Sequence, residues 1–491
     1  MGNGQAGEIS RRIVDVARRR MQTELVIAIH GPRSVGKSTV LRRLAHDLGT
    51  EVIDLDNLET RSAFAADPAL FTTEMVPLLL DEYQRVPSSL DAIKTVLNSS
   101  AVPGRFVITG STRHESLPPV TQALTGRLHI MDLFPLSQGE IEGVHENFLE
   151  VALNHPLIVA QNTTKGASRS DYIKRICAGG FPLALQRDGS SRERWFDDYV
   201  RLSIERDVEL VAPRIRQATL LAPLLERLAS QTGQVLNVAA SAEQIRMNKS
   251  TAENYVSLLE AVYLVRRLPA WGKTLRSRVS QLPKIHIVDS GLAARLLGLN
   301  PTRLGTLNPS VMTEFGHLLE TFVVGELSKQ STWLDEHVEL SHWRTRDGEE
   351  VDLVIERDNG QILAFEVKAT THIKESDLKS MRQLRFITGD SFVAGFLLYT
   401  GDRSYTIDDR IHVIPISRLW SPLRPIAQDG YVAREFNDAE MAQYAIDQAE
   451  WKVRRLTEER ERAEKDAAKQ SAHAKLVALG LTEEEISALS N

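Results

Sequence analysis

Three short apolar runs in the first quarter of the chain are bounded by polar or glycine-containing segments. They span residues 26–29, 75–80 and 106–108. Apolar runs of this kind are typical of parallel strands that are buried on both faces of a sheet. After the first run, residues 40–44 place apolar and basic side chains at helical spacing, as expected of an amphipathic helix. The pattern predicts an α/β core over residues 1–140.

The first apolar run leads into a loop that is bounded by two glycines. Residues 31–38 read Gly-Pro-Arg-Ser-Val-Gly-Lys-Ser, which is the pattern of a phosphate-binding P-loop. Such a loop directs backbone N–H groups and a helix N-terminus at a phosphate chain. Lys37 would reach the β- and γ-phosphates, and the Ser38 hydroxyl would hold Mg²⁺. The alternative is a chance glycine turn, but the strand–loop–helix context favours ATP and Mg²⁺ as cofactors. The predicted nucleotide-binding residues are Gly31, Pro32, Arg33, Ser34, Val35, Gly36, Lys37, Ser38 and Thr39.

The second apolar run ends in two acids, Asp81 and Glu82. Downstream of a P-loop, an acid at the C-terminal end of a buried parallel strand is typical of the residue on the Mg²⁺ side of the site. We therefore expect Asp81 to orient the metal and Glu82 to polarise the attacking water as general base. The alternative is a strand that ends in an acidic loop.

Further polar residues that suit ATP hydrolysis follow the third run. Thr109 and Ser111 end it in hydroxyl groups, and either one would be the sensor beside the γ-phosphate, with Ser111 as our candidate catalytic residue. A plain strand-to-turn junction is the alternative for both. Arg127 follows a glycine and would act as an arginine finger on a neighbouring subunit's γ-phosphate, unless it is an ordinary surface arginine.

The order of several motifs along the chain resembles a known family. Besides residues 31–38, the matching strings are residues 80–87, 108–111, 133–137, 179–182, 205–207, 284–292 and 343–348. They resemble the bacterial and archaeal AAA+ ATPases that carry a C-terminal domain of the PD-(D/E)XK nuclease fold and have no assigned function. The resemblance covers residues 10–422 and leaves the tail outside. It implies an oligomeric ATPase with a nuclease-like domain.

Overall composition suits an intracellular globular protein. A length of 491 residues suggests about three domains, and 42% hydrophobic with 25% charged residues is ordinary globular usage. The single Cys177 excludes an internal disulfide framework and suits a reducing, cytoplasmic location. We find no apolar run long enough for a secretory core or a membrane span. Because the net charge is −6, contact with DNA would depend on local basic patches.

Two segments are candidates for contact with DNA. The first holds Arg11, Arg12 and residues 18–20, and it reads equally well as a solvated helix face. The second follows a winged-helix pattern, with a short helix over residues 239–245, a longer one over residues 249–259 and an extended wing. Its longer helix would present Lys249, Ser250 and Asn254 outward, like a helix that reads the major groove. Use of the same unit for packing or protein contact is the alternative.

The third region carries a second set of acids. Residues 350–355 alternate like a strand, and the next apolar run ends in Glu366-Val367-Lys368. Together with Asp352, this is the spacing of a PD-(D/E)XK nuclease. Asp352 and Glu366 would clamp Mg²⁺, Lys368 would act catalytically on the water or the phosphate charge, and Glu320 would add an acid from a helix. The alternatives are an inactive relic of the fold or a salt-bridged strand pair.

The tail differs from the rest in composition. Residues 437–476 are rich in Ala, Glu, Lys, Arg and Gln and lack Gly and Pro, which favours a long exposed helix or a coiled coil. Gly480 and the Thr482–Glu485 pair then predict a helix end followed by a capped helix.

These observations predict four parts. They are a P-loop AAA+ core over residues 1–140, a helical lid and winged helix over 141–300, a nuclease-like α/β domain over 301–422 and a helical tail over 423–491. The function that fits them is an ATP-dependent, oligomeric DNA-processing ATPase, and resemblance to nuclease-fold resolvases suggests branched DNA such as a Holliday junction. The rival is a nucleotide-switched regulatory or defence scaffold whose nuclease-like domain only binds.

Overall fold

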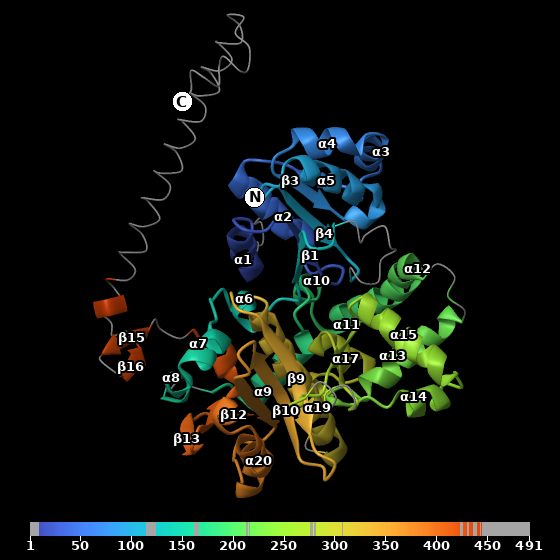
Figure 1. The fold of residues 1–491 in the computed structure, drawn as a ribbon. Coiled ribbons are helices and arrows are strands. Elements are labelled where there is room, and N and C mark those ends of the chain that lie inside the picture. Colours follow the sequence, from blue (N-terminus) through green and yellow to red (C-terminus); the bar gives the residue numbers. More distant parts are fainter. Residues whose placement is uncertain are drawn as a thin grey trace, which may run out of the picture. The chain divides into compact units, whose positions relative to one another are not determined.

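The chain forms two compact units, Met1–Leu423 and Arg424–Asn491, in a computed structural model (Figure 1). The structure describes residues 9–113, 124–161, 166–212, 215, 217–274, 278, 281–306, 308–422, 426–429, 432–435, 439–441 and 443. No helix in these described ranges is long and apolar enough to cross a membrane.

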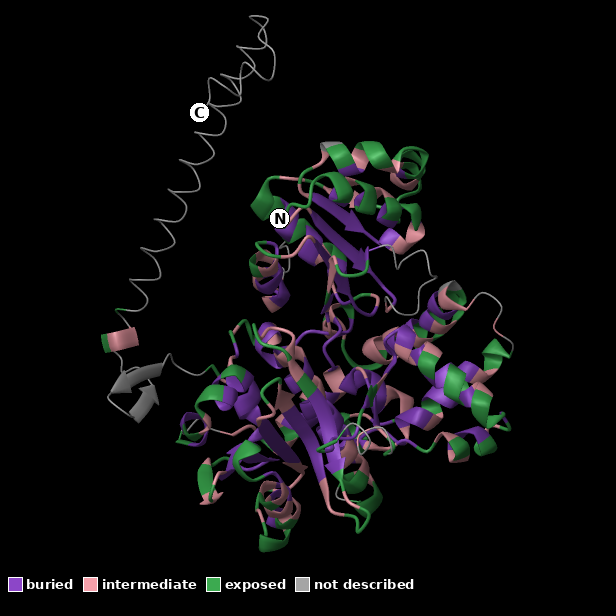
Figure 2. Ribbon diagram, in the orientation of Figure 1, coloured by how far each residue is buried: buried purple, intermediate pink, exposed green. Residues whose placement is uncertain are grey.

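The N-terminal part of the first unit is built on a parallel five-stranded sheet. Its strands are β1 (Val26–His30), β2 (Val52–Asp54), β3 (Leu78–Asp81), β4 (Phe106–Gly110) and β5 (Leu128–Asp132), in the order β2-β3-β4-β1-β5. The accompanying helices are α1 (Arg12–Arg20), α2 (Lys37–Leu48), α3 (Leu58–Ala66), α4 (Pro68–Glu74), η1 (Tyr83–Arg85) and α5 (Ser88–Ser99). Every residue of β1, β3 and β4 is buried, as the three apolar runs predict, and Figure 2 shows these strands in the buried colour.

A helical segment follows the parallel sheet. Its elements are α6 (Gln138–Glu142), α7 (Phe148–Asn154), α8 (Pro156–Gln161), α9 (Arg169–Ala178), α10 (Pro182–Leu185), α11 (Gly189–Leu202), η4 (Ser203–Asp207), α12 (Val208–Val211) and η5 (Ala218–Leu220). The η4 segment is a π-helical turn that continues α11, and π-turns of this kind frequently lie at functional sites. Aromatic packing fixes α11, since Phe181 and Tyr199 lie 4.7 Å apart between ring centroids.

Residues 221–287 form what we call the winged-helix unit. It contains α13 (Leu221–Ala229), β6 (Gln234–Val235), α14 (Val238–Gln244), α15 (Lys249–Ala261), β7 (Val265–Leu268) and β8 (Lys284–Ile287). The strands pair antiparallel in the order β6-β8-β7. The two expected helices are present as α14 and α15, and Asn248 caps α15 by accepting a hydrogen bond from the Ser250 amide.

The last part of the first unit is a second α/β layer, residues 290–422. Its helical elements are α17 (Ser290–Leu296), α18 (Pro301–Leu304), α19 (Pro309–Ser331), η6 (Glu375–Leu378), α20 (Lys379–Thr388), η7 (Gly389–Ser391) and η8 (Ile416–Trp420). Its strands are β9 (Val338–Arg344), β10 (Glu350–Arg357), β11 (Ile362–Lys368), β12 (Phe392–Tyr399), β13 (Tyr405–Asp408) and β14 (Ile411–Pro415), in the order β13-β14-β12-β11-β10-β9. The β9-β10-β11 meander is antiparallel, whereas β11, β12 and β14 are parallel. The expected hairpin of residues 350–355 and 362–368 is therefore present.

The second unit begins with a hairpin instead of a helix. Strands β15 (Ile426–Asp429) and β16 (Val432–Glu435) pair antiparallel. The expectation of a helical tail over 423–491 is therefore wrong for residues 426–435. Most of the expected tail helix, and the capped helix after it, lie outside the described residues.

Candidate functional site

The loop between β1 and α2 has the backbone of a phosphate cradle. Gly36 adopts φ 97° at the start of α2, a left-handed conformation that favours glycine. A Cβ on Gly31 would lie 2.1 Å from the carbonyl oxygen of Leu133, so only glycine fits there. The loop opens into a cavity of about 760 Å³ that residues 33–39 line together with Asp54, Asp56 and Glu82.

Lys37 lies inside this loop with 5% of its surface exposed. Its ammonium donates to the carbonyl oxygens of Gly31 and Pro32, each at 3.0 Å, and lies 3.9 Å from Glu82 Oε1. Burial lowers the pKa of Lys37 although the neighbouring acids oppose the shift. The cation is thus held at the mouth of the cradle, where a phosphate would meet it.

The two acids at the end of β3 are each held by a hydroxyl group from β4 or its end. Thr109 Oγ1 donates to Asp81 Oδ1, and Ser111 Oγ donates to Glu82 Oε2 at 3.1 Å. Gln84 Nε2 also donates to Glu82 Oε2 and reaches Ser111 Oγ at 3.0 Å. Both candidate sensors therefore contact the expected catalytic acids, and Gln84 is a partner that the sequence did not single out.

The residues present fit a magnesium–nucleotide complex. A helix N-terminus, a buried lysine and Gly36 face the cavity, and Ser38, which lines it, and Asp81, at the end of β3, would supply oxygen ligands of the kind that Mg²⁺ prefers. Bound Mg²⁺ would neutralise charge on the phosphates. The roles of these residues remain predictions from the sequence.

Two arginines tie the loop to the helical segment. Arg33 Nε pairs with Asp207 Oδ1 of η4, and burial raises the pKa of Asp207 against the opposing charge of Arg33. Arg11 is buried: it donates to the Val35 carbonyl, to the Phe134 carbonyl at 2.7 Å and to Glu140 Oε1 at 3.1 Å. Neither connection is visible as local sequence spacing.

The end of β4 also connects the site to the winged-helix unit. Two residues after Ser111, the Arg113 amide donates to the Ala261 carbonyl at 3.0 Å, and its Nε donates to the Glu260 carbonyl at 3.1 Å. The Arg113 guanidinium lies 5.0 Å from the ring centroid of Tyr263. The segment that follows β4 thus holds Glu82 through Ser111 and contacts the last turn of α15 through Arg113.

Arg127 does not line the phosphate-loop cavity of its own chain. It is partly exposed and donates to Asn98 Oδ1 at 2.7 Å. Action on a neighbouring subunit stays a prediction.

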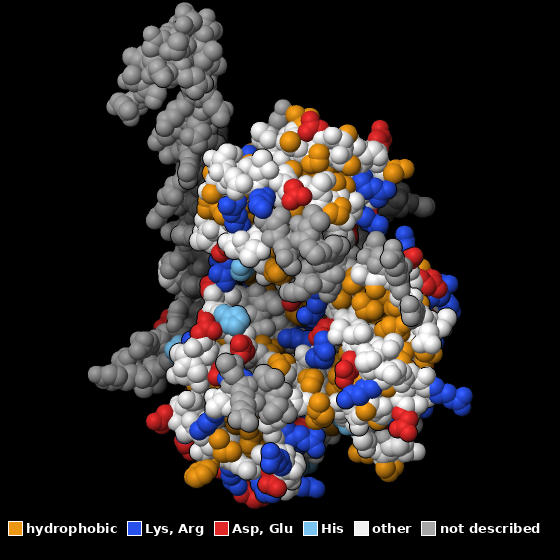
Figure 3. Space-filling model, turned by 45° about the vertical axis from the view of Figure 1, so that its right-hand side comes forward, with side chains coloured by type: hydrophobic (Ala, Val, Ile, Leu, Met, Phe, Trp, Pro, Cys, Tyr) orange, Lys and Arg blue, Asp and Glu red, His pale blue; other side chains and the backbone are white. Residues whose placement is uncertain are grey.

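The two candidate DNA segments differ in availability. In α15, Lys249, Ser250 and Asn254 are exposed as expected, although Lys249 lies 3.6 Å from Glu253. The N-terminal patch is largely paired internally, since Arg11 is buried and Arg18, Arg19 and Arg20 form ion pairs. Figure 3 shows Lys and Arg dispersed among Asp and Glu on the face it displays.

The acids of the second α/β layer surround a lysine. Lys284, the first residue of β8, is fully buried. Its ammonium donates to Glu320 Oε1 at 2.7 Å and to Asp352 Oδ1 at 3.0 Å, and it pairs with Glu350 Oε1. Burial alone would lower the pKa of Lys284, but the charges of Asp352, Glu320 and Glu350 hold that pKa well above its ordinary value.

Glu366 and Lys368 lie beside this cluster. Lys368 Nζ donates to Glu366 Oε1 at 2.8 Å, while Glu366 Oε2 is buried without a hydrogen-bond partner among the described residues. Burial and the charge of Asp352 raise the pKa of Glu366 to about 8.

This arrangement does not fit the expected Mg²⁺ site of Glu320, Asp352 and Glu366. In the described part of the chain, no group of three or more His, Cys, Asp or Glu side chains is arranged to hold a metal ion. An ammonium already uses the oxygen atoms that would face a cation. Local sequence does not indicate the role of Lys284, because this role depends on contacts with residues 36 and 68 positions away.

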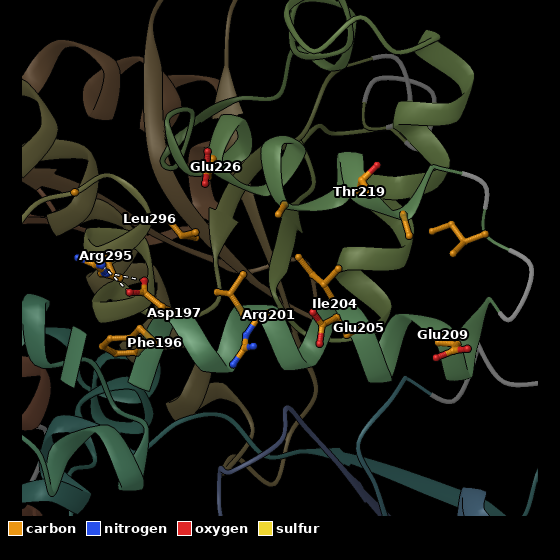
Figure 4. Close-up of a pocket in the computed structure, with 15 residues that line it drawn as sticks. Phe196, Asp197, Arg201, Ile204, Glu205, Glu209, Thr219, Glu226, Arg295 and Leu296 are labelled. Carbon is orange, nitrogen blue, oxygen red and sulfur yellow. Dashed lines mark hydrogen bonds and ion pairs between the residues drawn. The ribbon is translucent and has the colours of Figure 1, made fainter. Parts of the chain in front are cut away.

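A second cavity, of about 890 Å³, is lined in part by residues of α11 and η4. Figure 4 shows Arg201, Ile204, Glu205 and Glu209 projecting from this continuous helix, with the Asp197–Arg295 ion pair at one end. Asp207, on the same turn as Glu205, contacts the phosphate loop.

Three family models match separate parts of the chain. Residues 23–142 match an AAA domain, residues 169–303 match a domain of unknown function (DUF8612), and residues 315–419 match another domain of unknown function (DUF4143). With the geometry of the loop, the first match shows that the chain carries an AAA-type ATPase domain.

Two mycobacterial relatives span most of the chain. They are the uncharacterized proteins Rv2008c of Mycobacterium tuberculosis and Mb2031c of Mycobacterium bovis, each 26% identical over 405 residues, or 82% of this chain and 82% of the relative.

Two solved structures show some similarity to this chain. The Walker-type ATPase PABY2304 of Pyrococcus abyssi has 13% identity and a TM-score of 0.35, and the match covers 59% of this chain and 96% of that one. The RuvB Holliday junction branch migration motor of Thermotoga maritima has 16% identity and a TM-score of 0.23, with 52% and 88% covered. At these TM-scores the similarity supports no argument about function.

Proposed function

We propose that this protein is an oligomeric ATPase that uses ATP hydrolysis to reposition its winged-helix unit on DNA. One observation carries the proposal. The Ser111 hydroxyl holds the carboxylate of Glu82, and Arg113, two residues later, is bonded to the last turn of α15. A change at the γ-phosphate that moves Ser111 would therefore be felt at the helix that presents Lys249 and Asn254.

In the proposed reaction, the chain's own residues bind, orient and accept a proton. The loop amides and Lys37 bind the phosphates, and bound Mg²⁺ offsets the phosphate charge. Glu82 orients the attacking water and accepts its proton. Ser111 and Gln84 occupy Glu82 Oε2, so Glu82 becomes fully available as a base when these donors turn to the γ-phosphate.

Contact with DNA would use the exposed face of α15. Lys249, the first residue of α15, and Asn254, five residues later, are both exposed, and a lysine and an amide side chain suit a phosphate and a base edge. Glu253 on α15 and Glu243 on the preceding helix α14 are also exposed, so affinity would be modest and sensitive to salt. Branched DNA, such as a Holliday junction, is the substrate suggested by the resemblance of the chain.

Stimulation of ATP turnover by DNA tests this proposal. The full chain is assayed with single-stranded, duplex, forked and four-way DNA, with binding followed by gel shift with and without ATP. We expect at least one DNA to raise turnover, and the Lys249→Ala/Asn254→Ala double variant to lose the stimulation while its basal turnover is unchanged. Lys94→Ala, an exposed lysine on α5, is the matched control. An ATP turnover rate that none of these DNAs changes would contradict the proposal.

A second candidate function is favoured by the lysine in the acidic cluster. Because Lys284 engages Glu320 and Asp352, residues 301–422 would act as a binding module of a nucleotide-switched regulatory or defence scaffold rather than as an endonuclease. Under that candidate, ATP turnover responds to a protein partner and DNA has no effect. The DNA panel therefore separates the two functions.

A further inference from the structure

The contact between Lys284 and its three acids joins two parts of the fold. Lys284 begins β8 of the winged-helix unit, Glu320 lies on α19, and Asp352 lies on β10. Nearby, Thr232 and Thr321 hydroxyl groups lie 2.9 Å apart, and His286 Nδ1 lies 3.2 Å from Thr321 Oγ1. The ammonium is thus enclosed in a polar seam between the winged-helix sheet and the second α/β layer.

Most of the oxygen atoms of this cluster accept from protein donors. Asp352 Oδ1 accepts from Lys284 and Asp352 Oδ2 accepts from the Val367 amide at 2.9 Å. Glu320 Oε1 accepts from Lys284, and Glu366 Oε1 accepts from Lys368. Glu366 Oε2 is the buried cluster oxygen without a partner in the described residues. A divalent cation needs several such oxygens at once, so its position is already taken.

We propose that the ε-ammonium of Lys284 is the resident cation of this cluster and stands where a divalent metal would otherwise bind. Removal of this buried lysine would leave Glu320 and Asp352 without its counter-charge, whereas Glu350 would keep its ion pair with Arg344. Such a set of carboxylates, with Glu366 Oε2 beside it, is suited to Mn²⁺ or Mg²⁺. The same ammonium latches strand β8 to the second α/β layer, so a metal gains access only when β8 withdraws.

Binding of Mn²⁺ to the nucleotide-free full chain tests the proposal directly. Electron paramagnetic resonance measures free Mn²⁺ during titration of wild type, Asp352→Asn, Lys284→Met and the Lys284→Met/Asp352→Asn double variant. Methionine retains the length of the lysine side chain without its charge. We expect wild type and Asp352→Asn to bind equal amounts, Lys284→Met to bind one further equivalent, and the double variant to lose that equivalent. Any Mn²⁺ at the phosphate loop is common to all four proteins.

Each departure from this pattern contradicts the proposal. If Asp352→Asn removes one equivalent from wild type, the acids bind metal in the presence of Lys284. If Lys284→Met is folded, as judged by its melting curve, and gains no Mn²⁺, the ammonium does not occupy a metal position. If Lys284→Met fails to fold, the comparison of wild type with Asp352→Asn still decides whether the native cluster holds a metal. The Mn²⁺ titration does not depend on ATP turnover. Failure of this proposal is therefore distinguishable from failure of the proposed function.

Discussion

Arg33 of the phosphate loop forms an ion pair with the buried carboxylate of Asp207, which belongs to a π-helical turn far along the chain. The side chain of Asp207 is 3% exposed, whereas that of Arg33 is 25% exposed and lines the nucleotide cavity. A charge that arrives beside Arg33 therefore competes with Asp207 for the same guanidinium. This pair gives the nucleotide site a direct physical link to the helix α11–η4.

Loss of the Asp207 charge should weaken this link. We expect Asp207→Asn to lower kcat by about ten-fold or more and to change KM for ATP by a smaller factor, because the helix is no longer held against the loop. Because burial outweighs the charge of Arg33 and raises the pKa of Asp207, loss of the carboxylate charge should not lower the melting temperature. Steady-state kinetics and thermal unfolding measure both effects.

Asp197→Asn is the matched control for that variant. Asp197 lies on the same helix, α11, and pairs with Arg295 of α17. Half of the Asp197 side chain is exposed. Exposed pairs contribute about 0–1 kcal/mol, so its melting temperature and turnover should stay near wild type. Equal effects of the two substitutions would contradict the prediction, because they would mean that the Arg33–Asp207 contact does not contribute specifically to turnover.

Substitution of the loop lysine and of the acid after β3 should separate binding from hydrolysis. Lys37→Ala should abolish nucleotide binding because the ammonium offsets phosphate charge in the ground state. Glu82→Gln should bind ATP with near wild-type affinity and fail to hydrolyse it, because the general base is lost. Fluorescent-nucleotide titration and phosphate release measure the two steps. Wild-type turnover by Glu82→Gln would move the base elsewhere.

Arg127 should act between subunits if it is an arginine finger. Arg127→Ala should then retain ATP affinity and lose turnover by roughly 10³-fold. Mixing it with Glu82→Gln subunits should restore some activity, because mixed interfaces pair an intact arginine with an intact base. An inert mixture with demonstrated subunit exchange would contradict action in trans and leave Arg127 as a surface residue that contacts Asn98.

Local patterns were sufficient for the elements, and distant contacts were not predictable. The strand, loop and helix around residues 26–48 follow from an apolar run, two glycines and helical spacing, all within a short segment. The role of Arg11 does not follow from local pattern, because a run of arginines suggests a solvated helix face. Arg11 is instead buried against Glu140, 129 residues away. Lys284 shows the same limit, since a lysine at the start of a strand carries no sign of the acids that surround it.

The buried carboxyl of Glu146 should make stability depend on pH. Its side chain is 1% exposed and lies against Gly139. Burial, with the charges of Glu326 and Glu140, raises its pKa from 4.5 to about 7. The folded state thus holds a proton that the unfolded chain releases near pH 4.5. This contribution is full below about pH 4.5, declines as the pH rises from 4.5 to 7, and is lost above pH 7.

Glu146→Gln should remove this dependence, because an amide of the same shape carries no titrating proton. The shift corresponds to about 3 kcal/mol, so the variant should gain stability on wild type by that order between pH 5 and pH 8, as measured by urea unfolding at several pH values. Glu150→Gln, an exposed acid on the neighbouring helix α7, is the matched control and should follow the wild-type profile. Parallel stability profiles for Glu146→Gln and wild type would contradict this prediction, because they would mean that the pKa of Glu146 is not raised in the folded protein.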